Sequence, residues 1–271
     1  GGGPDPAGIR HARGAPRVLA ETPRRRGRFD LPGAITGTAG VTALVYGLIS
    51  AATTPDGVSH WGDAKVIASL AAAAVLLAAF AVIETRSRQA LLPIRLLRDR
   101  TRTGAYLSYA GVGIFIFGMF FFLTVFMQAV WGYSALKTGL AYLPFTAALF
   151  LGAGAVAQLV PKIGARPVLL AGSAAATGGL FWLSRISEHA TYASAVLGPT
   201  LVIGAGAALL FVTLSLVALN RVPEADSGVA SSLLNTGQQL GGSIGLALLG
   251  TVAWTVVAHS THAQAASPSS R

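Results

Sequence analysis

The sequence predicts an all-α membrane protein with about seven transmembrane helices. Its 271 residues are 53% hydrophobic and only 11% charged, and the mean hydropathy is +0.62. A soluble domain usually carries about 25% charged residues, so this chain has too little polar surface to face water. Seven long stretches lack Asp, Glu, Lys and Arg, and the basic residues gather in alternate loops between them.

The seven uncharged stretches give the expected helices in chain order. A helix that crosses the bilayer needs about 20 mostly apolar residues, each rising 1.5 Å. The expected helices cover residues 31–52, 66–83, 104–130, 138–160, 167–184, 192–219 and 228–258. Seven such helices in succession leave no amphipathic helix that could shield them from water, which argues against a soluble all-α fold.

The positions of Lys and Arg predict the orientation, because cytoplasmic loops of membrane proteins carry an excess of them. With the N-terminus placed in the cytoplasm, only 4 of the 20 basic residues lie outside: Lys65, Lys137, Arg185 and Arg271. The chain is therefore expected to be a multi-pass protein with a cytoplasmic N-terminus and its own C-terminus outside. This distribution also explains the net charge of +10 without a nucleic-acid partner.

The polar segments divide the chain into five parts. Residues 1–28, rich in Gly, Pro and Arg, are expected to form a disordered basic cytoplasmic segment, and the missing initial Met hints at a partial sequence. Two transmembrane helices follow in 29–83, then a basic cytoplasmic loop in 84–103. Five further helices occupy 104–258, and 259–271 is expected to be a polar tail.

Several motifs are more specific than hydropathy. The turn 131–144 reads Trp-Gly-Tyr-Ser-Ala-Leu-Lys-Thr-Gly-Leu-Ala-Tyr-Leu-Pro. The last helix opens over 227–245 as Ser-Gly-Val-Ala-Ser-Ser-Leu-Leu-Asn-Thr-Gly-Gln-Gln-Leu-Gly-Gly-Ser-Ile-Gly. Arg-Phe-Asp-Leu-Pro-Gly at 28–33 precedes the first helix. In these motifs the chain resembles the major facilitator superfamily, and within it the fourteen-span drug:proton antiporters of the EmrB/QacA type.

The resemblance covers about residues 28–258 and implies spans seven to thirteen of fourteen. The helices in 29–83 would be the linker pair between two six-helix bundles, and those in 104–258 would form most of the C-terminal bundle. The implied activity is export of amphiphilic drugs or metabolites by proton antiport across a bacterial plasma membrane. The implied partners are the lipid bilayer, an amphiphilic small-molecule substrate, protons and the missing N-terminal bundle.

The acidic residues bear on whether the chain transports alone. All 10 lie in loops or at helix ends, whereas proton coupling needs an acid inside the membrane. The resemblance places that acid in the front half of the family, so this chain is expected to be inactive without it. The alternative is a non-transporting membrane fragment, or a half-transporter that needs a partner chain. We expect no enzyme activity, no metal site and no cofactor.

The loop 161–167 is similar to a weak repeat of the family's cytoplasmic Gly-x-x-x-Asp-Arg-x-Gly-Arg motif. Gly164 and Arg166 are retained and the Asp is absent. The resemblance implies a gate loop, in which Arg166 would contact helix C-termini or acids and hold the inward gate closed. A plain positive-inside anchor is the alternative.

The last expected helix carries two neighbouring stripes. At about 100° per residue, four polar residues share one face. They are Ser231, Asn235, Gln238 and Gln239. They are candidates for the wall of a substrate cavity, with structural hydrogen bonding across a helix contact as the alternative. Small residues beside them recur every four positions, a pattern that allows close helix packing. They are Gly237, Gly241 and Gly245.

The helix at 104–130 is rich in aromatic residues. Tyr109 and Phe115 are its candidates for a cavity that binds hydrophobic ligands, because such sites combine aromatic walls with few polar anchors. Packing within the protein or contact with lipid is the alternative role of these rings.

Overall fold

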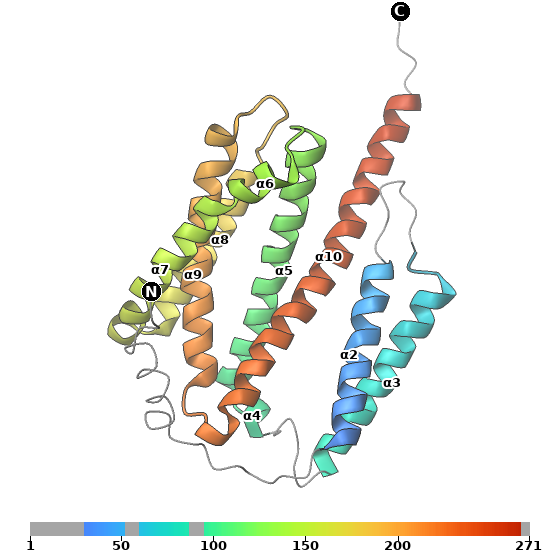
Figure 1. Cartoon of the computed structure of the whole chain (residues 1–271), viewed down its shortest axis with the longest axis vertical. Coiled ribbons are helices and arrows are strands. Elements are labelled where there is room, and N and C mark those ends of the chain that lie inside the picture. Colours follow the sequence, from blue (N-terminus) through green and yellow to red (C-terminus); the bar gives the residue numbers. More distant parts are fainter. Residues whose placement is uncertain (1–29, 52–59, 87–94, 267–271) are drawn as a thin grey trace, which may run out of the picture.

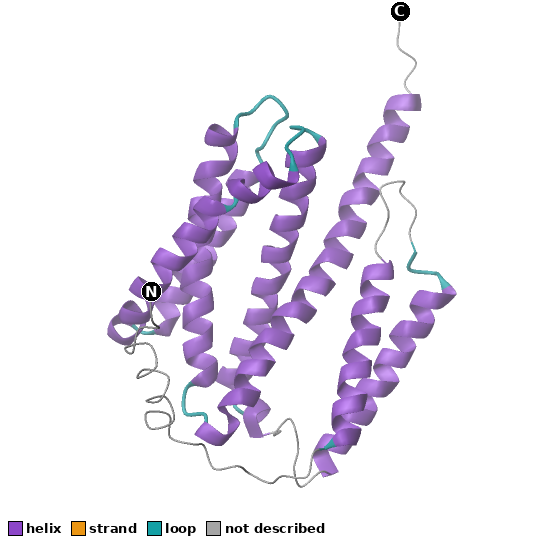
Figure 2. Ribbon diagram, viewed as in Figure 1, coloured by secondary structure: helices purple, strands orange, loops and turns teal. Residues whose placement is uncertain are grey.

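The computed structural model describes residues 30–51, 60–86 and 95–266, and these residues form helices and turns without a strand (Figure 2). Each of the seven expected stretches corresponds to a long helix. These helices are α2 (Leu31–Ala51), α3 (Ala64–Arg86), α5 (Arg100–Ala129), α7 (Leu143–Ile163), α8 (Ala165–Leu183), α9 (Gly198–Leu219) and α10 (Ser227–Ala266). The all-α prediction is confirmed.

Short helical segments join the long helices. They are α4 (Arg95–Arg98), α6 (Ala135–Ala141), a π-helical turn (Ala193–Leu197) and a 3₁₀ turn (Glu224–Asp226). Among the described residues, five segments are long and apolar enough to cross a membrane. These are α2, α3, α5, the joined α6–α7 and the joined π-turn–α9. The other two long helices, α8 and α10, are richer in small and polar residues.

Helix boundaries differ from the expected ones where polar residues continue a helix. Asp99 caps α5, and its carboxylate accepts hydrogen bonds from the backbone N–H groups of Thr101 and Arg102. The helix therefore begins within the expected loop 84–103. Likewise α10 continues to Ala266, inside the expected tail 259–271. Helices usually end before a proline, and Pro268 follows that last turn. The expected segment 1–28 lies outside the described residues.

Helix α9 lies at the centre of a five-helix body (Figure 1). It contacts α5, α7, α8 and α10, and several of its side chains, Ile203 and Ala207 among them, are fully buried. The pair α2–α3 stands beside this body and contacts it through α2 and α10. The body has two ends, the α6 end and the α4 end, each named for the short helix that lies there (Figure 1).

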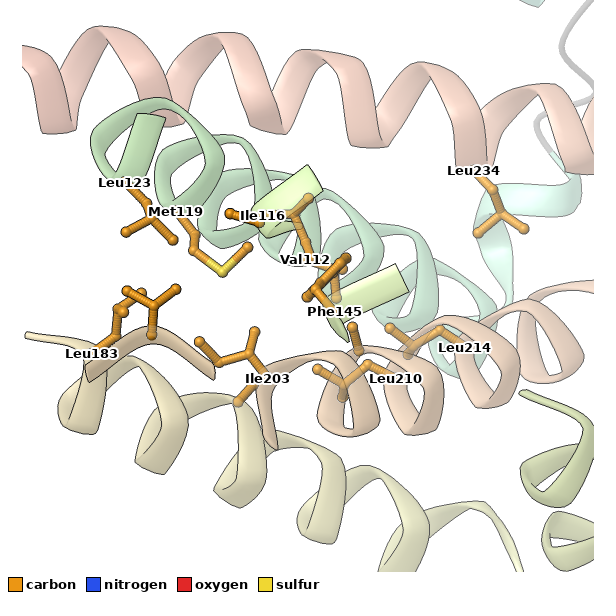
Figure 3. Close-up of a cluster of buried hydrophobic side chains, with 14 of the residues drawn as sticks. Val112, Ile116, Met119, Leu123, Phe145, Leu183, Ile203, Leu210, Leu214 and Leu234 are labelled. Carbon is orange, nitrogen blue, oxygen red and sulfur yellow. The ribbon is translucent and has the colours of Figure 1, made fainter. Parts of the chain in front are cut away.

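The main apolar core lies between α5 and α9 (Figure 3). On both helices the buried residues follow the spacing i, i+4, i+7, i+11, which places them on one helical face. The residues on α5 are Val112, Ile116, Met119 and Leu123. Those on α9 are Ile203, Ala207, Leu210 and Leu214. Phe145 of α7 and Leu183 of α8 extend this core to the neighbouring helices.

Helices α5 and α10 approach backbone to backbone. A Cβ atom on Gly241 would overlap the Ala110 carbonyl group, and one on Gly245 would come within 2.9 Å of the Ile114 Cα. One on Gly237 would lie 3.7 Å from the Tyr106 carbonyl oxygen. The structure thus places all three glycines of the small-residue stripe against α5, where no larger residue fits at the central position.

We expect Gly241→Ala to lower the thermal stability of the purified protein. The added methyl group must push α10 away from Ala110, and overpacking of this kind costs about 1–3 kcal/mol. The measurement is thermal unfolding in detergent, followed by circular dichroism. Gly154→Ala is the matched control, because a Cβ there meets no atom within 4 Å. Equal melting temperatures for the two variants would contradict the close contact.

Candidate functional site

An apolar cavity of about 470 Å³ lies along the seam between α5 and α10. Its walls are Ile116, Phe117, Phe120, Phe121, Thr124, Val125 and Leu246. The ring of Phe117 lies against Gly242, which has no side chain to displace it. Thr124 supplies the hydroxyl group in an otherwise aromatic and aliphatic wall. Such a cavity suits a hydrophobic group with one polar anchor.

The predicted polar stripe of α10 lies nearer the α4 end than this cavity. Ser231 and Gln238 are half-buried, whereas Asn235 and Gln239 are exposed. The Asn235 amide donates a hydrogen bond to the Ser231 carbonyl over 3.4 Å. Among the described residues, the amide groups of Gln238 and Gln239 have no hydrogen-bond partner. The stripe therefore continues the seam with amide groups that are open to a ligand or to another part of the protein.

Tyr109 and Phe115 lie on different sides of α5. The ring of Tyr109 packs edge-on against Phe211 of α9, with ring centroids 5.2 Å apart. Phe115 instead lines two grooves beside α8. Phe115 follows Tyr109 by six positions, so the two side chains point about 120° apart around the helix. Among the described residues, no hydrogen bond or ring contact joins either of these candidates to the α10 stripe.

Two adjacent grooves lie between α5 and α8. The first, of about 290 Å³, carries the hydroxyl groups of Ser108, Ser173 and Thr177. The second, of about 760 Å³, is almost wholly apolar and extends to α10. Phe115 and Leu180 line both. These hydroxyl residues were not among the site residues predicted from the sequence. The signal was present in the i, i+4 spacing of Ser173 and Thr177 within an apolar helix.

Hydroxyl groups tie the helices together at the α6 end. Tyr142 donates its proton to the Phe120 carbonyl over 3.0 Å, so its oxygen accepts the bond from Thr124 at 2.8 Å. Tyr192, just before the π-turn, donates to the Ala141 carbonyl over 2.8 Å. Because Phe120 and Thr124 line the 470 Å³ cavity, Tyr142 fixes one of its walls. Neither tyrosine was predicted from the sequence as a site residue.

The predicted gate loop is a sharp turn. Gly164 has φ = 85° and donates its N–H to the Val160 carbonyl over 2.9 Å, which ends α7. The left-handed φ explains the glycine, since residues with a Cβ seldom adopt it. Arg166 is exposed and forms no hydrogen bond or ion pair with the described part of the chain. Its role as a gate residue stays a prediction.

A different arginine makes the contact that was expected of Arg166. The Arg102 guanidinium donates to the carbonyl of Asn220, at the C-terminal cap of α9, over 3.2 Å. A cation at this position is favoured by the partial negative charge of the helix end. This contact holds α5 to the turn between α9 and α10 at the α4 end. Among the described residues, no three His, Asp or Glu side chains gather in a group that could hold a metal ion.

The chain matches the family model described as Major Facilitator Superfamily over residues 22–246. It is 34% identical over 235 residues to the puromycin resistance protein of Streptomyces alboniger. This match covers 84% of the chain and 46% of the relative. It is 37% identical over 243 residues to the cephamycin export protein of Amycolatopsis lactamdurans, covering 88% of this chain and 49% of the relative.

A multidrug resistance protein of Mycobacterium tuberculosis is 35% identical over 246 residues, covering 90% of this chain and 44% of the relative. The chain thus spans about half the length of these relatives. The apolar helices of the chain and its similarity to these relatives show that it is embedded in a membrane.

We expect Tyr142→Phe to destabilise the α6 end of the body. The change leaves the Phe120 carbonyl and the Thr124 hydroxyl without this partner, at a cost of about 1–3 kcal/mol. The measurement is the melting temperature in detergent. Tyr46→Phe is the control, because Tyr46 is an exposed tyrosine on α2 with no hydrogen bond among the described residues. An unchanged melting temperature for Tyr142→Phe would contradict the assigned role.

Proposed function

The chain belongs to the major facilitator superfamily, and on that premise we propose that it is the C-terminal portion of a proton-coupled exporter of amphiphilic drugs or metabolites. In this proposal the full protein is a fourteen-span antiporter of the EmrB/QacA type, and the chain supplies spans seven to thirteen. Helices α2 and α3 are the linker pair, and α5 to α10 belong to the C-terminal bundle.

The seam between α5 and α10 is the observation that carries the proposal. Its cavity offers aromatic rings with a single threonine hydroxyl, and the neighbouring stripe offers the amides of Gln238 and Gln239. An amphiphilic molecule needs both kinds of surface next to each other. The names of the relatives point the same way, since they refer to puromycin resistance, cephamycin export and multidrug resistance.

Transport by two bundles that rock about a site near the midplane is the mechanism that fits such a seam. The second wall of the site would then come from the N-terminal bundle. Among the described residues the buried acids are Glu84 and Asp226, and both lie at helix ends. A proton relay needs an acid within the membrane, so we assign proton coupling to the remainder of the protein.

In this proposal the α4 end faces the cytoplasm of a bacterial cell, as the distribution of Lys and Arg indicates. Arg102 then holds α5 against the α9–α10 turn on the cytoplasmic side. Tyr142 and Tyr192 connect the helices on the outer side. The two ends of the body are thus fixed by different contacts, and the seam between them is left for the substrate.

The test is dye efflux from bacterial cells that lack their own exporters. One strain carries the full-length protein that contains this chain, and a second carries the chain alone. We expect efflux from the first strain that stops when a protonophore removes the proton gradient. The second strain should show none. Absence of gradient-dependent efflux from the full-length protein would overturn the proposal, and efflux by the chain alone would contradict its dependence on a second bundle.

Within the full-length protein we expect the double variant Gln238→Ala, Gln239→Ala to export amphiphilic dyes more slowly. Loss of one or two hydrogen bonds to a bound substrate, at about 0.5–1.5 kcal/mol each, predicts a drop of about twofold or more in transport efficiency. Thr236→Ala is the control, because Thr236 is exposed on the same helix but outside the stripe. Equal efflux rates for the two variants would exclude the amides from the substrate path.

A further inference from the structure

The α2–α3 pair forms a tightly packed antiparallel hairpin. Gly40 of α2 lies against Leu77 of α3, and Gly47 lies against Leu70 and Ser69. A Cβ on Gly47 would approach the Ser69 hydroxyl oxygen to 2.8 Å, so a larger residue there would displace the side chains of Ser69 and Leu70. Close packing through small residues holds helices together in a bilayer. The hairpin therefore behaves as one unit.

A long-range hydrogen bond connects this hairpin to α10. The indole Nε1 of Trp61, just before α3, donates to the Thr251 hydroxyl oxygen over 3.0 Å, although 190 residues separate the two in the sequence. The Thr251 hydroxyl in turn donates to the Ala247 carbonyl over 2.8 Å. A buried tryptophan usually satisfies its N–H, and here the half-buried Trp61 finds its acceptor on a different helix.

Helix α10 is enclosed on two opposite sides. Its glycine stripe, including Gly245, faces α5. Ala247 points about 200° away from Gly245, and yet it is fully buried. Of the helices that contact α10, α2 is the one that stands apart from the five-helix body (Figure 1). The hairpin thus covers the side of α10 that the body leaves open.

We propose that the α2–α3 hairpin is a lateral brace for α10, and that Trp61 is a positioning residue that fixes α10 through Thr251. The consequence reaches the seam, because Leu246 of α10 lines the 470 Å³ cavity and precedes the braced Ala247. Movement of the hairpin therefore moves a wall of the cavity. This role goes beyond the proposed transport activity and holds whatever the substrate.

The chain has no native cysteine, so spin labels attach only to cysteines that are introduced in pairs at chosen positions. One pair, Val75→Cys and Leu248→Cys, joins exposed sites on α3 and α10. A second pair, Leu107→Cys and Leu151→Cys, joins exposed sites on α5 and α7 within the body. The measurement is the distance distribution of each pair by pulsed electron paramagnetic resonance, with the whole chain in lipid nanodiscs.

We expect Trp61→Phe to broaden the distance distribution of the α3–α10 pair. The fraction of molecules with distances outside the wild-type distribution should rise about threefold or more, because this factor corresponds to the loss of one typical hydrogen bond in a membrane. The α5–α7 pair should not change. Trp182→Phe is the matched control, because this exposed tryptophan packs on Gly198 of the body and its indole N–H has no hydrogen-bond partner among the described residues. It should leave the α3–α10 pair unchanged.

Thr251→Val is the second variant, and it keeps the side-chain volume while it removes the acceptor of the Trp61 bond. It should reproduce the effect of Trp61→Phe, and it decides the test if Trp61→Phe does not accumulate. Unchanged α3–α10 distances in these variants would overturn the proposal. A similar change in both labelled pairs would also overturn it, because Trp61 would then stabilise the whole fold and not the position of α10.

Discussion

The close approach of α5 and α10 is the constraint on which the rest of the structure depends. Lipid chains are as apolar as leucine, so helices in a bilayer are held together by close packing and not by the hydrophobic effect. Here each helix supplies glycine where the other presents its backbone: Gly113 of α5 lies against Gln238, and Gly241 of α10 lies against Ala110. This contact fixes the rotation of α10, and with it the direction of the polar stripe beside the glycines. It also lets the Phe117 ring lie over Gly242 and close the wall of the cavity.

Because α5 has neighbours on several sides, its aromatic residues have several different environments. Tyr109 packs on α9, Phe117 and Phe120 face the seam cavity, and Phe115 faces the grooves beside α8. The two α8 grooves also differ in polarity, since hydroxyl groups line the smaller one and are nearly absent from the larger one. One aromatic-rich helix therefore contributes to a candidate substrate cavity, to the core and to a lateral groove at once.

The number and order of the helices could be predicted from the sequence, because the thickness of the bilayer sets both their length and their lack of charge. Charges mark helix ends poorly, however: Lys65 lies inside α3, and Arg100 is the first residue of α5. The candidate site was harder to predict. The helical spacing shows that Tyr109 and Phe115 diverge, but which side of α5 forms a cavity depends on α7, α8 and α10, which are distant in sequence. The same holds for the arginines, since the motif drew attention to Arg166 while the turn after α9 lies beside Arg102.

The surroundings of α10 suggest why its polar residues are concentrated on one stripe. Its glycine side is closed by α5, and a second side meets the hairpin, which holds it through Trp61 and Thr251. Polar groups on either closed side would need partners within the packed helices, because an unpaired amide in an apolar environment costs several kcal/mol. Gln238 lies against Gly113 at the edge of the α5 contact and is half-buried, whereas Gln239, about 100° further around the helix, is exposed. The stripe they share runs beside the seam that carries the cavity. A helix that is held from two sides can present the amides beside these contacts in a fixed position, and the site proposed above for amphiphiles needs at least that much fixed polarity next to its aromatic wall.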